Sequence, residues 1–329
     1  MGIFKRRRAD TAALEAEALV RRIERAVSKG GANATAEEAR AELRECLAEA
    51  ESRLGDGHRA TQLALHHLSV ALILHTSLVA EAEAGFRRLR TIRGQALTDR
   101  ATPGLLRLHA ASLSRLGRHE EAAREYEIVG DQLGEHVDEL SSAWLIVRAL
   151  RSPELCHLRR FAEAEADARA IIERSVFTRA PIGLFVRWTA THALSYALTR
   201  QGRPEEAESA ARQALAAMRA RQDGRGDLVF SLELSLAHAL SAQGRYAEAL
   251  DGVTSARRAY NPSLHYDAAE VHTAGVPMAE ALLGLERHDE AAQVARDTIT
   301  ALTELFSPDH ACVRDARELL ERATSPTAP

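Results

Sequence analysis

The stretch LGRHEEAA, residues 116–123, decides how this chain is built, because variants of it recur along the sequence. Clear copies are QGRPEEA at 201–207 and QGRYAEA at 243–249, and weaker ones are LRRFAEA at 158–164 and LERHDEA at 285–291. The Glu-Ala pair of each copy gives a series at steps of 40 to 43 residues. Its members are Glu81, Glu121, Glu163, Glu206, Glu248 and Glu290, preceded by a fainter pair at Glu38. So regular a step indicates a repeat architecture.

Each copy has the same local order. An apolar run with helical spacing comes first, as at Leu232, Leu236 and Leu240. A turn glycine follows, because glycine adopts the left-handed backbone that ends a helix at little cost. Acidic residues then begin a second helix, where they favour the positive end of the helix dipole. The sequence therefore predicts an all-α chain of repeated helix–turn–helix hairpins.

The unit resembles the tetratricopeptide repeat. Its matching positions are the turn glycine, the alanine of Glu-Ala, and a small residue seven places before the glycine. The usual repeat of this family has about 34 residues, so this longer unit resembles the kinesin-light-chain-like subclass, here in a bacterial protein. The resemblance implies a right-handed α-solenoid of about seven hairpins with a C-terminal capping helix. Its repeat-structural residues would be Gly117, Ala122, Gly202, Ala207, Gly244, Ala249 and Ala291.

The domain boundaries follow from this reading. Residues 1–9 form a basic tip, residues 10–323 one solenoid with a degenerate first repeat, and residues 324–329 a tail. The capping helix is expected at about 308–323, with no partner after it. Pro153 and Pro277 fall inside predicted first helices, which they should kink or interrupt.

Composition limits the possible functions. The net charge of −4 gives no indication of a nucleic-acid partner. The three cysteines, Cys46, Cys156 and Cys312, are far apart and odd in number, which favours a reducing compartment. Neither a signal peptide nor an apolar run of membrane length is visible, so we expect a cytoplasmic protein without membrane insertion. A weak contact of the basic N-terminus with anionic lipid stays open.

The sequence shows no pattern that carries chemistry. It lacks a G-x-S-x-G turn, a phosphate loop and an H-E-x-x-H pair, and its glycines stand singly at turns. Cys156 and His157 are adjacent, so on a helix they point about 100° apart and form no dyad. We therefore expect no enzymatic activity, cofactor or metal.

The resemblance also implies where a partner would bind. In this family the first helices line a concave groove, with ligand-facing positions ten, six, three and two residues before the turn glycine. Carried over, these positions include Arg107, Ser114, Arg115, His192, Tyr196, Thr199, Arg200, Leu234, His238 and Ser241, and in weaker copies His67, His75, Cys156 and His157. The alternative is that these are ordinary exposed side chains.

Two functions remain. The first is a protein–protein interaction module, or adaptor, whose groove binds a partner peptide or protein segment with acidic or aromatic residues. The second is a peptide-sensing regulator that acts through a partner transcription factor or effector, because the N-terminal ~35 residues are too short for a DNA-reading domain of their own.

Overall fold

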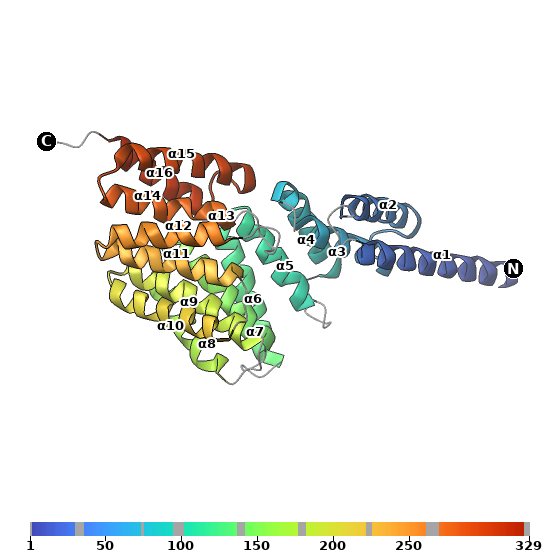
Figure 1. Ribbon diagram of the computed structural model, residues 1–329. Helices are drawn as coiled ribbons and strands as arrows, with labels where there is room; N and C mark the ends of the chain where they lie inside the picture. The colour runs from blue at the N-terminus through green and yellow to red at the C-terminus, as the bar shows by residue number, and fades with distance from the viewer. Residues whose placement is uncertain are drawn as a thin grey trace. The chain divides into compact units, whose positions relative to one another are not determined.

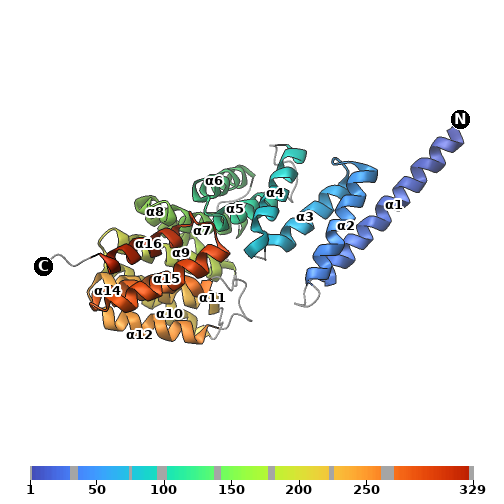
Figure 2. The ribbon, with the colours of Figure 1, turned by 90° about the horizontal axis from the view of Figure 1, so that it is seen from above.

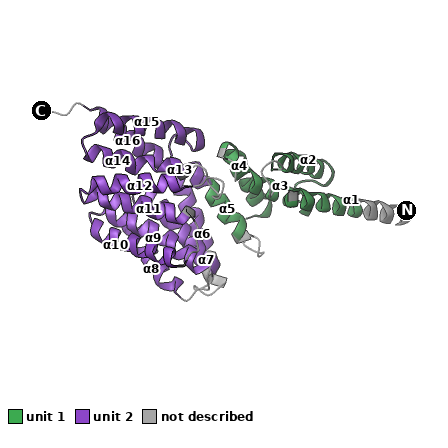
Figure 3. Ribbon diagram, in the orientation of Figure 1, with its two compact units in different colours: residues 1–112 green, residues 113–329 purple. Residues whose placement is uncertain are grey.

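Every regular element in the described residues is a helix (Figure 1). The computed structural model describes residues 2–29, 36–73, 76–94, 102–136, 142–176, 182–221, 226–260 and 270–325. His75, the linker residues 222–225 and most of the predicted tail lie outside them. The chain divides into two compact units, residues 1–112 and 113–329 (Figure 3). The prediction of one continuous solenoid over 10–323 stays a prediction.

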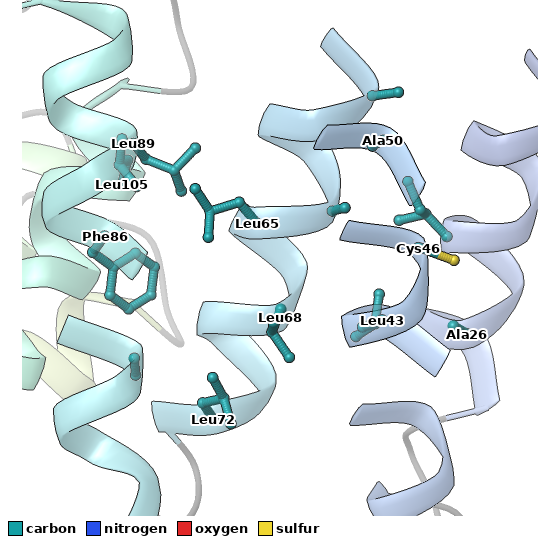
Figure 4. Packing of buried hydrophobic residues seen from close by; sticks show 14 of the residues in the cluster. Ala26, Leu43, Cys46, Ala50, Leu65, Leu68, Leu72, Phe86, Leu89 and Leu105 are labelled. Atoms are coloured by element: carbon teal, nitrogen blue, oxygen red, sulfur yellow. The ribbon is translucent and has the colours of Figure 1, made fainter. Parts of the chain in front are cut away.

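Unit 1 holds the first two hairpins and most of the next helix. Its elements are α1 (Gly2–Lys29), α2 (Ala36–Leu54), α3 (Arg59–Ile73), η2 (Thr76–Leu78), α4 (Val79–Arg93) and the greater part of α5 (Thr102–Arg115). The helix predicted to begin at Asp10 begins at Gly2, since the Lys and Arg residues of the expected tip are good helix formers. Leu43, Leu68, Leu72, Phe86 and Leu89 lie in one buried cluster (Figure 4).

Unit 2 continues the same alternation of first and second helices. After the end of α5 come α6 (His119–His136), α7 (Ser142–His157), α8 (Phe161–Ser175), α9 (Ile182–Arg200), α10 (Pro204–Arg221), α11 (Gly226–Ala242), α12 (Tyr246–Ala259), α13 (Glu270–Thr273), α14 (Gly275–Gly284), α15 (His288–Leu305) and α16 (Ala311–Thr324). From α6 to α12 each helix packs on the next, α14 packs on α12 and α15, and α15 packs on α16. The helices α7, α9, α11 and α14 also pack on one another in turn. The predicted all-α solenoid of stacked hairpins is confirmed.

The two internal prolines act differently. Pro153 was predicted to kink or interrupt its helix, and α7 runs through it without interruption. Pro277 is the third residue of α14, where a missing N–H leaves no helical hydrogen bond unmade. The helix break near it lies at Ala274, between α13 and α14.

The five turns between first and second helices in unit 2 share one conformation. Gly117, Gly202 and Gly244 have φ of 74°, 78° and 76°. In the two weaker copies, Arg159 and Glu286 stand at the glycine position and still have φ of 59° and 60°. In every turn the N–H of the next residue, an arginine, donates to the carbonyl five residues earlier at 2.9 Å, as in a Schellman cap. The turns recur at steps of 42 or 43 residues.

The conserved geometry extends into the second helix. The arginine after each turn forms an ion pair with the glutamate three residues on: Arg118–Glu121, Arg160–Glu163, Arg203–Glu206, Arg245–Glu248 and Arg287–Glu290. These pairs are exposed to solvent and so contribute little stability. The alanine that follows each glutamate is fully buried, in Ala122, Ala164, Ala207, Ala249 and Ala291. Acidic first turns and buried alanines are both as predicted.

Replacing Glu286 by glycine should stabilise unit 2. Its left-handed backbone costs a non-glycine residue about 1–2 kcal/mol, whereas glycine loses about 0.5–1 kcal/mol in unfolded-state entropy. We therefore expect Glu286→Gly to raise the free energy of unfolding by about 0.5–1 kcal/mol in urea denaturation. Glu205→Gly, in the ordinary first turn of α10, should lower it instead. A destabilised Glu286→Gly would contradict the strained turn.

The last helix returns to the beginning of unit 2. α16 packs on α14 and α15 and can be followed beside α15 in Figure 2. Its N-terminal residues also reach the α5–α6 turn and the end of α7. The backbone N–H of Ala311 donates to His119 Nε2 at 3.4 Å, and Arg314 Nη2 donates to the His157 carbonyl at 3.1 Å. We call this set of contacts the closing seam. The predicted C-terminal capping helix is α16. Its contacts with the start of unit 2 were not predicted.

Gly117 lies at the closing seam, and it provides a test with a matched control. A Cβ on Gly117 would lie 3.0 Å from the backbone N and Cα of His310, whereas a Cβ on Gly202 would meet nothing within 4 Å. Both residues have positive φ. Gly202→Ala should therefore cost about 1–2 kcal/mol for the backbone conformation alone. Gly117→Ala should cost at least about 1 kcal/mol more in urea denaturation, because backbone atoms of α16 must also move. Equal losses would show that the seam is not formed.

Candidate functional site

A cavity of about 220 Å³ opens on the first helices of unit 2. It is lined from α7, α9 and α11, from the α13–α14 segment, and from α16 with the residue before it. The lining residues are Pro153, Cys156, His157, His192, Ala193, Tyr196, Ser231, Leu234, Ser235, His238, Thr273, Val276, His310, Cys312 and Asp315. Within the described residues, no second helix of a hairpin contributes to this lining, as expected for an inner surface of stacked first helices.

Four of the ten predicted groove residues meet here. His192 and Tyr196 are four residues apart on α9, and Leu234 and His238 are four apart on α11, so each pair lies on one helix face. Cys156 and His157, predicted from a weaker copy, also line the cavity. Tyr196 and His238 meet edge to face, with ring centroids 5.4 Å apart.

The other predicted residues do not line it. Ser114 Oγ donates to Glu154 at 2.6 Å, and Thr199 Oγ1 donates to the Ser195 carbonyl at 2.9 Å. The Arg200 guanidinium lies 5.8 Å from the Phe161 ring centroid, outside the cavity. The remaining members that are not lining residues are Ser241, which is buried, Arg115, and Arg107 in unit 1. Positions two and three before the turn lie in the last helical turn, away from the middle of the groove.

Sequence reasoning missed the contribution of α16. His310, Cys312 and Asp315 line the cavity, but the periodic pattern placed this helix at an outer end. Ser231 and Ser235 were also missed, although Ser231 lies three residues before Leu234 and Ser235 three before His238, at helical spacing on α11. Helical spacing from the predicted residues could have found the two serines.

His192 has a defined tautomer. Its Nδ1 lies 3.1 Å from the Ser231 carbonyl oxygen, which can only accept, and 2.6 Å from Ser235 Oγ. Nδ1 therefore carries the proton. Burial lowers the pKa of His192 to about 4, so the ring is neutral near pH 7. Its Nε2 is consequently a hydrogen-bond acceptor.

Two carboxyl groups stand near the histidines. His238 Nδ1 lies 2.7 Å from Glu280 Oε2. Burial opposes ionisation of Glu280, but the hydrogen bond from His238 and nearby positive charges such as Arg200 and Arg322 together outweigh it and lower the pKa. At Asp315 burial dominates and raises the pKa, with Arg314 acting in the opposite direction. Burial also raises the pKa of both Cys156 and Cys312 to about 12, so these thiols are protonated near pH 7.

Three histidines gather at the closing seam beside the cavity. The ring centroid of His119 lies 4.5 Å from that of His157 and 4.9 Å from that of His310. His119 Nδ1 is 2.8 Å from Glu154, while His310 stacks on Phe306 at 4.3 Å and its Nδ1 accepts from the Cys312 N–H. Burial, then the neighbouring His119, lowers the pKa of His310 to about 3. The seam thus favours a neutral imidazole at His310.

Acid should weaken unit 2 through this cluster. A histidine whose folded-state pKa lies below its ordinary value of about 6.5 binds fewer protons folded than unfolded, so its contribution is lost as pH falls below 6.5. The loss is about 1.4 kcal/mol per pH unit for each such histidine. In urea denaturation, His310→Asn should reduce the stability difference between pH 7.5 and 5.0 by about 2 kcal/mol, since asparagine keeps the helix cap without titrating. An unchanged pH difference would exclude a neutral His310 in the folded state.

The described residues form neither a metal site nor a membrane-spanning helix. Among the described residues, no group of three or more His, Cys, Asp or Glu is arranged to hold a metal ion. Within the same part of the chain, no helix combines the length and apolar character that crossing a bilayer requires.

Comparison with known proteins defines the class of fold. No protein-family model and no curated protein matches the chain. Among solved structures, a tetratricopeptide repeat protein from Parabacteroides merdae is similar with a TM-score of 0.62 and 15% identity, over 94% of this chain and 99% of that one. A Rap protein complexed with Competence and Sporulation Factor has a TM-score of 0.57 and 12% identity, over 95% and 97%. PlcR of Bacillus thuringiensis, in complex with the peptide PapR7 and DNA, has 0.52 and 12%, over 93% and 99%.

These similarities agree with the repeat geometry of the chain. The chain has a tetratricopeptide-repeat fold, as the turn glycines and Glu-Ala pairs predicted. At such low identity the likeness concerns the fold alone. Assignment to the kinesin-light-chain-like subclass and to a bacterial source stays a prediction.

Proposed function

We propose that this protein is a non-enzymatic interaction module that binds a peptide, or an extended segment of a partner protein, at the cavity of unit 2. The observation that carries the proposal is the meeting of His192, Tyr196, Leu234 and His238 from two first helices on one hollow surface. Concave solenoid surfaces commonly serve as binding sites. The cavity is smaller than the ~300–1,000 Å³ typical of small-molecule pockets, so it suits a side chain of a longer ligand.

The chemistry of the cavity favours binding over catalysis. Its two cysteines are protonated, whereas a nucleophilic cysteine must be a thiolate. His192 Nδ1 carries its proton and faces the Ser231 carbonyl and Ser235 Oγ, so it cannot take the proton of the Ser235 hydroxyl as a general base. A cytoplasmic location and the lack of a cofactor are part of this proposal.

A second candidate is a peptide-sensing regulator. The Rap and PlcR structures similar to this chain contain a signalling factor and a peptide, respectively. If the same use of the fold applies here, unit 2 would bind a short peptide, and the chain would act through a partner transcription factor or effector. A separate DNA-binding domain is not part of this candidate.

Filling the cavity should abolish binding. We expect peptides selected from a displayed random library against the wild-type chain to bind Leu234→Trp at least tenfold more weakly in fluorescence anisotropy. The new indole would occupy the space the ligand needs. Tyr196→Ala, which enlarges the cavity, should also lose affinity, because a rigid aromatic contact disappears.

The matched control is Ala247→Trp, at an exposed position on α12, a helix outside the lining. It should bind the selected peptides like the wild type. Melting temperatures of all variants check that the fold is kept. Selected peptides that bind Leu234→Trp as tightly as wild type, or a library that gives no binder, would overturn the proposed site.

A further inference from the structure

The cavity is rich in hydrogen-bond acceptors. None of its lining residues is a lysine or an arginine. His192 presents Nε2 as an acceptor, because Nδ1 carries the proton. His238 directs Nδ1 to Glu280, so a further carboxyl group stands beside the cavity. A ligand group that donates hydrogen bonds would therefore match the cavity, whereas a carboxylate would not.

Asp315 adds a charge to this pattern. It stands on α16 in the lining, with its side chain 24% exposed. Its nearest cationic atoms are Arg159 Nη2 and Arg314 Nε, both at 3.8 Å and so beyond hydrogen-bond distance.

Each of these arginines is engaged elsewhere. Arg159 Nη2 donates to Glu318 at 2.6 Å, and Arg314 Nη2 donates to the His157 carbonyl. Within the described part of the chain, the Asp315 carboxylate therefore receives no hydrogen bond. A donor from a ligand would therefore form a charge-assisted hydrogen bond with this partly exposed carboxylate.

Tyr196 supplies the remaining element. Its ring lines the cavity between α7 and α11 and contacts His238 by its edge. An aromatic ring close to a carboxylate attracts organic cations, through the negative face of the ring and through the opposite charge.

We propose that the cavity receives a lysine or arginine side chain of the partner segment, with Asp315 and the Nε2 atom of His192 accepting its N–H groups. This inference rests on the proposed function and specifies its ligand. It differs from the partner with acidic or aromatic residues that the sequence led us to expect. Arg107, Arg115 and Arg200, which would pair with acidic residues of a partner, are not on the cavity lining.

The test uses peptide pools that differ at one position. Each pool is acetylated and amidated at its ends, with random uncharged residues around a centre fixed as Lys, Arg, Glu or norleucine. Binding is measured by fluorescence anisotropy. On the wild-type chain the Lys and Arg pools should bind at least about tenfold more tightly than the Glu and norleucine pools, the effect expected of a hydrogen-bonded charge.

Asp315→Asn should remove most of that tenfold preference, because the amide keeps the shape but not the charge. Asp315→Glu should restore part of it. The matched control Glu321→Gln removes an exposed carboxylate from the same helix, outside the cavity lining, and should keep the full preference. Melting temperatures verify that each variant folds.

The outcomes separate this inference from the function on which it rests. If all four pools bind the wild type equally and lose binding to Leu234→Trp, the cavity is still the peptide site. The proposal that it receives a basic side chain would then be overturned. Preference for Glu would overturn it as well. A norleucine pool with a free N-terminal amine that matches the Lys pool would assign the cavity to a chain terminus instead. No binding by any pool, or undiminished binding to Leu234→Trp, would overturn both proposals.

Discussion

The whole repeat depends on one backbone turn, in which a residue with positive φ lets the next N–H close on a carbonyl five residues back. The bond has the same length, 2.9 Å, in all five turns of unit 2. It ends the first helix, and the arginine that donates it also stands at the start of the second. One short segment thus fixes both helix ends in the same way in each hairpin. Stacking identical hairpins then gives a regular inner surface.

The regular stacking of the hairpins determines where the cavity forms. A fully buried alanine at the start of each second helix allows close approach to the first helix. First helices are thereby aligned side by side, and residues four apart on α9 and α11 come to the same hollow. The cavity is therefore a product of the repeat itself, whereas its chemistry comes from residues that differ between repeats, such as His192 and Leu234.

Much of the fold could be predicted because its signals are local. Turn glycines, acidic helix starts and small residues at fixed spacing report contacts within about ten residues, so a single sequence displays them. The same logic located His192, Tyr196, Leu234 and His238. It could not show that Arg159 and Glu286 would adopt the left-handed conformation, because the five-turn pattern as a whole imposes it on residues that do not favour it.

The contribution of α16 was beyond sequence reasoning for another reason. The hydrogen bond from Ala311 to His119 joins residues 192 positions apart, and no periodic spacing encodes such a contact. An amphipathic helix after the last hairpin looks the same whether it ends the stack or returns to its start. His310 and Asp315 therefore entered the site only once the path of the chain was known.

The closing seam has a consequence for how such a protein evolves. Open solenoids gain or lose hairpins by duplication and deletion, because each repeat contacts only its neighbours. In unit 2 the start of α16 contacts the α5–α6 turn and the end of α7, so the geometry fixes the number of intervening hairpins. One hairpin more or fewer would carry Ala311 away from His119. Unit 2 is thus expected to diversify by substitution within a fixed number of hairpins rather than by growth of the array.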